Sequence, residues 1–155
     1  MYFIIRIMNQ KAEKFDLLVA DLNKGGNSWF TKEEMTDDLN TVVYHGRLDV
    51  HDHSLPVFIV VDDSAFTYAR IAITTTSIDE KVIPAVLKEL NTLNQDYKVS
   101  KYYVSVEDNN IYMDVSMPCL NEQFDPTVVV NLLLEVIQPH LDAVHKDILK
   151  VAGLA

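Results

Sequence analysis

The chain has 155 residues, of which 48% are hydrophobic and 23% charged, and its formal net charge is −10. These values fit one globular domain over 1–155 and exclude a disordered or fibrous protein. The negative charge repels phosphates and anionic lipids, so the sequence predicts no nucleic-acid and no membrane partner. A single cysteine, Cys119, permits no disulfide within the chain and favours a cytoplasmic location.

The N-terminal segment 1–8 is rich in aromatic and β-branched residues, which predicts an extra strand or an extended arm. Arg6 interrupts it and no small-residue cleavage site follows, so a signal peptide is not predicted. From 11 to 23, apolar residues recur at helical spacing while charged residues such as Lys11 take the other side, which predicts an amphipathic helix. The segment 28–40 is predicted to be irregular or to form a short helical turn from Thr31.

Three strands with short connections are predicted next. Between 42 and 51, apolar and polar residues alternate with the two-residue period of a strand that has one covered face. The segment 55–61 is apolar on both sides except at Pro56, and 65–75 forms a third strand that exposes Arg70. Turns at 52–54 and 62–64 make the three strands an antiparallel meander.

A helix is predicted after this meander. Ser77 and Glu80 have the spacing of a capping box, so the helix is expected to begin near Ile78. Pro84 lies inside the apolar stripe and removes a backbone donor. Either the first turn is kinked, or the regular helix begins close to Pro84.

A hairpin over 101–117 and a closing helix complete the chain. Asp125 and Pro126 suit the N-cap and the first position of that helix. Pro139 predicts a kink or break near Gln138, with an embedded half before it and a freer half beyond it for a subunit or partner contact. The order α-β-β-β-α-β-β-α predicts an α+β domain, with an antiparallel sheet and helices on one face.

This order of elements, with Leu90-Asn91-Thr92-Leu93-Asn94 ending the second helix, resembles the YbjN-like family, whose fold is that of type III secretion chaperones. The resemblance covers most of the chain after about Asn9 and is strongest from Ile78 onward. It implies a small, acidic homodimer that holds an extended segment of a partner protein and has no assigned enzymatic activity. The segment 1–8 and the proline of the closing helix depart from the family pattern, and either could alter the partner surface or the dimer.

His51-Asp52-His53 is the most suggestive polar cluster. Two imidazoles and a carboxylate could ligate zinc, with Asp49 or His45 adding a further ligand. No HExxH or paired-cysteine motif accompanies the cluster, so a solvated turn explains it better. The sequence therefore predicts no metal ligand and no cofactor.

The other candidate residues have structural explanations. Asp62-Asp63 lacks the glycine and the acidic spacing of a calcium loop and is predicted to be a charged turn. On a regular helix His140 and His145 point about 140° apart, so a shared ligand is not expected. Cys119 has no neighbouring base, and neither a serine triad order nor a phosphate loop occurs. No catalytic and no cofactor-binding residue is predicted.

Aromatic residues occur along most of the predicted strands and before the first of them. They are expected either to pack within the core or to lie on a face that another chain covers. The set comprises Trp29, Phe30, Tyr44, Phe58, Phe66, Tyr68, Tyr102, Tyr103 and Tyr112.

The sequence favours a non-enzymatic, homodimeric protein-binding module, chaperone-like or regulatory. The alternative is a metal-dependent hydrolase that uses His51 and His53. A regulatory or immunity-like protein whose acidic surface blocks a basic target also fits the composition.

Overall fold

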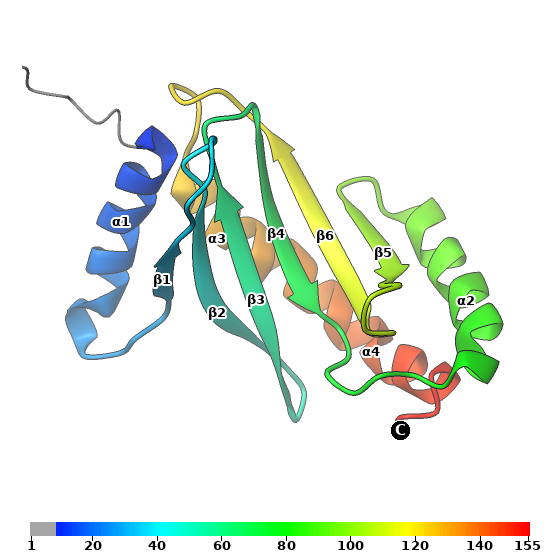
Figure 1. Cartoon of the computed structure of the whole chain (residues 1–155). Helices are drawn as coiled ribbons and strands as arrows, with labels where there is room; N and C mark the ends of the chain where they lie inside the picture. Colours follow the sequence, from blue (N-terminus) through cyan, green and yellow to red (C-terminus); the bar gives the residue numbers. More distant parts are fainter. Residues whose placement is uncertain (1–8) are drawn as a thin grey trace, which may run out of the picture.

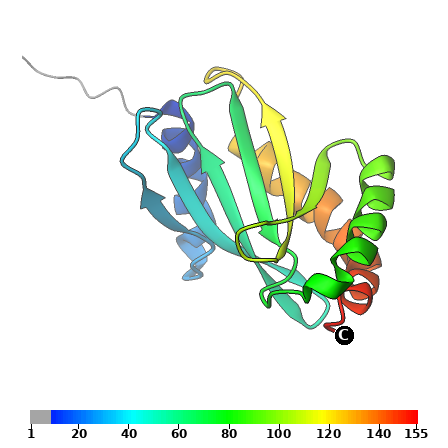
Figure 2. The ribbon, with the colours of Figure 1, turned by 45° about the vertical axis from the view of Figure 1, so that its right-hand side comes forward.

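The computed structural model describes residues 9–155, and the predicted strand or arm at 1–8 lies outside these described residues. The described part forms one six-stranded sheet with helices on one side of it (Figures 1 and 2). In chain order the elements are α1 (Gln10–Leu22), η1 (Asn23–Gly25), β1 (Thr31–Glu34), β2 (Val42–Val50), β3 (His53–Val61), β4 (Phe66–Ala72), η2 (Glu80–Val82), α2 (Ile83–Asp96), β5 (Ser100–Val104), β6 (Ile111–Pro118), α3 (Pro126–Leu132), η3 (Leu133–Ile137) and α4 (Gln138–Val151).

The strand order is β1-β2-β3-β4-β6-β5, and every neighbouring pair is antiparallel. Strands β1 to β4 form the predicted meander with one extra strand, and the β5–β6 hairpin joins it through β6. Helices α3 and α4 run behind the strands in Figure 1, and no described helix lies in front of them. The predicted α+β fold with helices on one face is therefore confirmed.

Strand β1 is an addition to the predicted order. The sequence predicts an irregular segment or a helical turn at 28–40, but Thr31–Glu34 pairs with β2 as an edge strand. All four residues of β1 are exposed. The segment therefore has none of the apolar alternation by which a half-covered strand is recognised.

Helix α2 begins at Ile83, next to Pro84, which is one of the two predicted outcomes. The predicted capping box between Ser77 and Glu80 does not form. Asp79 instead accepts a hydrogen bond from the backbone of the short turn η2 and caps it. The Ser77 hydroxyl donates to a backbone carbonyl in the β5–β6 loop.

The closing helix runs without a break from Pro126 to Val151. Its predicted N-cap is confirmed, because the Asp125 carboxylate accepts a hydrogen bond of 2.9 Å from the backbone N–H of Thr127. Pro139 has no N–H to donate. The π-helical turn η3 immediately before it widens the helix by one residue, so the helix accommodates the proline without breaking.

The prediction of a freer half beyond Pro139 is wrong. The part beyond the proline, α4, buries His140, Leu141, His145, Ile148 and Leu149, whereas α3 and η3 together bury Val129, Leu133 and Ile137. By length and composition alone this 26-residue helix, with a mean hydropathy of 1.3 over its most apolar window, could cross a membrane. Its buried side chains belong to the core of this fold, and Val128, Leu134 and Val136 stay exposed.

The core lies between the helices and the covered face of the sheet. Its largest fully buried side chains include Tyr44, Phe15, Ile59, Ile71, Met113 and Leu141. Lys11 departs from the prediction, because it is fully buried and its Nζ donates a hydrogen bond of 2.6 Å to the carbonyl of Ser64. This contact joins α1 to the β3–β4 turn.

Candidate functional site

The candidate binding surface is the face of the sheet that the described helices leave uncovered, called the open face below. Because side chains alternate along each strand, the residues between the buried ones lie on this face. In Figure 2 the helices again lie on the opposite side. The open face carries Glu33, Val43, His45, Arg47, Asp49, Phe58, Val60, Phe66, Tyr68, Arg70, Lys101, Tyr103, Tyr112 and Asp114.

The strand register places one row of these residues directly across five strands. His45 is opposite Phe58, Phe58 is opposite Arg70, Arg70 is opposite Asp114, and Asp114 is opposite Lys101. The aromatic pair Tyr103 and Tyr112 lies next to this row and is stacked, with ring centroids 5.9 Å apart and planes 25° apart. Cross-strand pairs of this kind stabilise a sheet while leaving one side of each ring available.

Arg70 is the centre of the open face. Its Nε and one terminal nitrogen donate to the two carboxylate oxygens of Asp114 at 2.8 and 3.0 Å. The guanidinium also lies over the rings of Tyr68 and Tyr103, 5.3 and 5.8 Å from their centroids. The hydroxyl of Tyr103 donates to Asp114 at 3.3 Å. The cluster is therefore fixed from several sides before any partner arrives.

The charge states of this cluster are stable near neutral pH. The hydrogen bonds that Arg70 donates to Asp114, followed by the negative charge of that carboxylate, raise the pKa of Arg70 above its ordinary value. Burial, followed by the nearby Asp114 carboxylate, raises the pKa of Tyr103 to about 12. A hydrogen bond to Asp108 raises the pKa of Tyr112 to about 12. Arg70 therefore stays charged and Tyr103 and Tyr112 stay neutral near pH 7, so these three side chains offer binding groups and not an acid or base.

The outer edge of β5, next to the open face, is occupied by a side chain of α2. Asn94 accepts a hydrogen bond of 2.7 Å from the backbone N–H of Tyr102 and donates one of 3.1 Å to its carbonyl. The amide side chain thus takes the place of a neighbouring strand at this residue. The last residue of the Leu90–Asn94 signature therefore covers part of a sheet edge.

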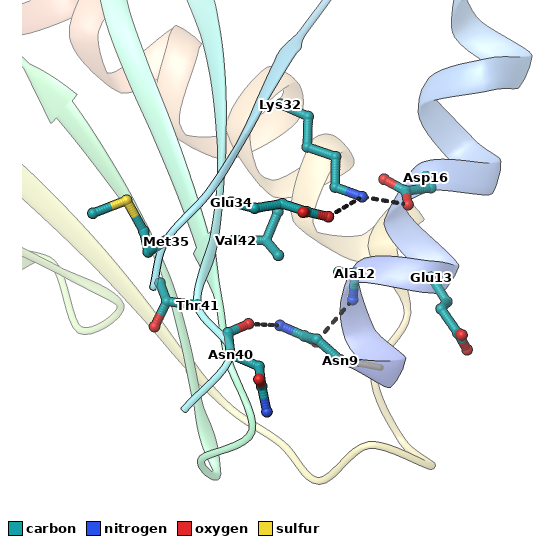
Figure 3. Close-up of a pocket in the computed structure, with 10 residues that line it drawn as sticks. All are labelled: Asn9, Ala12, Glu13, Asp16, Lys32, Glu34, Met35, Asn40, Thr41 and Val42. Atoms are coloured by element: carbon teal, nitrogen blue, oxygen red, sulfur yellow. Dashed lines mark hydrogen bonds and ion pairs between the residues drawn. The ribbon is translucent and has the colours of Figure 1, made fainter. Parts of the chain in front are cut away.

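A cleft of about 250 Å³ lies between α1 and the β1–β2 edge (Figure 3). Lys32 reaches across it to Asp16 of α1 at 2.9 Å and also contacts Glu34, on its own strand, at 3.4 Å. The hydroxyl of Tyr44 also donates to Asp16, at 2.7 Å. The hydrogen bond with Asp16 raises the pKa of Lys32, and burial raises that of Tyr44. These bonds hold α1 against the sheet, which is a structural role.

The residues of the predicted histidine cluster separate in the structure. The His51 ring bonds to the backbone carbonyl of Asp142 at 2.6 Å, and His53 packs against His145. His45 lies on the open face and pairs with Glu33 at 2.7 Å. Within residues 9–155, no three His, Cys, Asp or Glu side chains are arranged to hold a metal ion.

The other polar candidates have structural surroundings. Asp62 accepts hydrogen bonds from the backbone and hydroxyl of Ser64, which makes it part of a turn. The imidazoles of His140 and His145 are both buried but have different partners: the Tyr102 hydroxyl at 2.7 Å and the Ile73 carbonyl at 3.1 Å. Cys119 is a partly buried free cysteine packed against the core.

The aromatic set divides between the two predicted locations. Tyr44, Tyr102 and Phe30 pack in or against the core, whereas Phe58, Phe66, Tyr68, Tyr103 and Tyr112 lie on the open face, with Phe66 61% exposed. Trp29, which precedes β1, fits neither location and is 47% exposed. Sequence reasoning did not identify the Arg70–Asp114 pair. Its residues are 44 positions apart, and only the β4–β6 register brings them together.

No protein-family model matches this sequence, and a comparison with curated proteins finds no match. Among solved structures, a chain in the crystal structure described as the ExsC–ExsE complex is similar, with a TM-score of 0.55. The two chains are 10% identical, and the similarity covers 90% of this chain and 96% of that one. The fold is type III secretion chaperone-like. At 10% identity the similarity shows a shared fold alone, and the functional residues and partners of that protein are not assigned to this chain.

Proposed function

We propose that this chain is a non-enzymatic protein-binding module, chaperone-like or regulatory, which acts as a cytoplasmic homodimer and holds a partner protein on its open face. The observation that carries the proposal is the uncovered cluster around Arg70. Tyrosine and arginine are enriched among the residues that contribute most to protein–protein binding. A cluster that is already ordered loses little side-chain freedom when a partner binds.

The fold supports the same proposal. The similar solved structure is described as a complex of two proteins, ExsC and ExsE, which fits a fold used for binding. Membership of the YbjN-like family, indicated by the element order and the Leu90–Asn94 segment, is part of the proposal. It adds the expectation of a homodimer without enzymatic activity.

The charge distribution also favours the open face as the contact surface. Three basic residues, Arg47, Arg70 and Lys101, balance three acidic ones, Glu33, Asp49 and Asp114, so the face is formally neutral by 3 − 3 = 0, whereas the chain carries −10. Electrostatic repulsion of an acidic partner is therefore weaker on this face than the net charge of the whole chain would suggest.

Affinity capture with matched variants tests the binding surface. We expect proteins captured from the native organism by the unaltered chain to be lost with Tyr103→Ala and with Tyr68→Ala, but retained with Lys146→Ala on the exposed side of α4. Circular dichroism of each variant shows whether it is folded. Identical capture by all three variants would remove the open face from the proposal.

Light scattering during size-exclusion chromatography tests the homodimer. The expected mass is near twice the 17.6 kDa of one chain. A strict monomer at all concentrations would refute this part of the proposal without affecting the capture experiment.

The alternative, a metal-dependent hydrolase using His51 and His53, has no observation in its favour. The two rings have separate partners, a backbone carbonyl and the ring of His145. Elemental analysis of the purified protein tests it directly, since a stoichiometric transition metal that is lost with His51→Ala would revive this alternative.

A further inference from the structure

The tip of the β2–β3 hairpin is fastened to α4 by three side-chain contacts. The His51 ring bonds to the carbonyl of Asp142 at 2.6 Å, and Gln138 donates to the carbonyl of Asp49 at 2.5 Å. The rings of His53 and His145 meet edge to face, with centroids 5.0 Å apart. His51, His53 and His145 are called the histidine latch below.

His145 is the buried member of the latch and is only 1% exposed. Its Nε2 faces the carbonyl of Ile73 at 3.1 Å, so this nitrogen carries the proton of the neutral ring. Its Nδ1 is buried and has no hydrogen-bond partner. A second proton would enter on Nδ1 and would create a buried charge with no acceptor to stabilise it.

A cavity of about 200 Å³ adjoins the latch. His53 and His145 are the titratable residues among those that line it, and the remainder, among them Ser54, Thr74 and Leu149, have hydroxyl or apolar side chains. No lining carboxylate could balance a positive imidazole.

The charged groups on the elements around the latch do not supply a hydrogen-bond acceptor to Nδ1 of His145. The hairpin contributes Asp49, His51, Asp52 and Arg47, whose guanidinium donates to Ser54, and α4 contributes Asp142, Lys146, Asp147 and Lys150, whereas residues 73–76 contribute none. Asp49 and Asp142 contact the latch through backbone carbonyls. Burial lowers the pKa of His145 from the ordinary 6.5, the hydrogen bond to the Ile73 carbonyl partly opposes this, and the neighbouring His53 and His51 lower it further.

We propose that the histidine latch is a pH-sensitive switch in which protonation of His145 releases the hairpin tip from α4 and opens the adjoining cavity. Because the closed state holds His145 neutral, the latch is fully closed above the ordinary histidine pKa of about 6.5. It opens as the pH falls below that value. The switch does not depend on the open face or on the proposed binding function.

Nuclear magnetic resonance of the full chain, titrated from about pH 7.5 to about pH 5 around that ordinary value, tests the switch. We expect the amides of 49–54, 73–76 and 138–149 to change together with one midpoint, while those of α1 and β1 keep their folded positions. The closed population at the lowest pH is expected to fall several-fold.

Three substitutions separate the latch from general acid unfolding. His145→Gln keeps a donor for Ile73 but cannot titrate, so the transition should disappear. His53→Gln, at an exposed position, should fold and should move the midpoint to higher pH, because His53 then no longer lowers the pKa of His145. His45→Gln, on the open face, should leave the midpoint unchanged.

The proposal is overturned if the unaltered chain stays closed across this range, or if α1 and β1 unfold at the same midpoint as the hairpin. It is equally overturned if His53→Gln leaves the midpoint where it is, a result that remains decisive even where His145→Gln does not fold.

Discussion

Replacing Asn94 by alanine should destabilise the protein by uncovering the edge of β5. The side chain makes two hydrogen bonds to the backbone of Tyr102, at 2.7 and 3.1 Å, in a partly buried place. In Asn94→Ala the backbone N–H and C=O of Tyr102 both lose their partner. Because Tyr102 is only 4% exposed, water cannot fully satisfy these two groups in place of the Asn94 side chain.

The magnitude follows from these two bonds. A net contribution of about 0.5–1.5 kcal/mol for each bond gives a loss of about 1–3 kcal/mol in the free energy of unfolding. For a chain of this length a loss of about 2 kcal/mol lowers the melting temperature by about 4–8 °C. The opened edge should also promote concentration-dependent association, because it exposes an unpaired N–H and C=O.

Urea denaturation and thermal melting measure the loss, and light scattering at several concentrations measures the association. Asn91→Ala is the matched control, since Asn91 lies on the exposed side of the same helix and its substitution has the same effect on helix propensity. We expect the control to stay within about 0.5 kcal/mol of the unaltered protein. Equal stability of the two variants would refute the assigned role of Asn94.

Three further predictions test other parts of the structure. Gly46→Ala should lower stability by about 1–3 kcal/mol in urea denaturation, because its added Cβ would lie 2.7 Å from the Phe30 ring, and an unchanged midpoint would contradict this packing. Asp114→Ala should cost about 1–3 kcal/mol, since the carboxylate is 9% exposed and its loss leaves Arg70 without its partner, although the 39% exposure of Arg70 keeps the effect near the lower end. Burial lowers the pKa of His140, so the free energy of unfolding should be highest above about pH 6.5 and should fall as the pH drops below that value. Urea midpoints at several pH values measure this dependence on pH, and His140→Gln should reduce it.

Local chemistry in the sequence was sufficient for most of the elements. Asp125 and Pro126 favour a helix start independently of tertiary packing, because the capping hydrogen bond of Asp125 and the fixed φ of Pro126 involve only neighbouring residues. Alternation likewise predicts β2, because one face of that strand is covered and the other is not. Strand β1 was missed, since both of its faces are exposed and the period carries no signal.

The candidate site depends on contacts between residues that are far apart in the sequence. Arg70 and Asp114 meet only because β4 pairs with β6, and that register is set by the packing of the whole sheet. The same holds for Lys11. Local periodicity predicts that this side chain is in solvent, but its tertiary contact with Ser64 buries it.

The sequence by itself determined the α+β class, the start of the closing helix and the absence of a recognisable catalytic motif, because these follow from composition and from interactions within a few residues. Only the tertiary structure decided which aromatic side chains stay uncovered, that Asn94 covers the β5 edge, and that His53 meets His145. Each of these pairs residues from different elements, and their approach is decided by how the helices cover one face of the sheet and leave the other open.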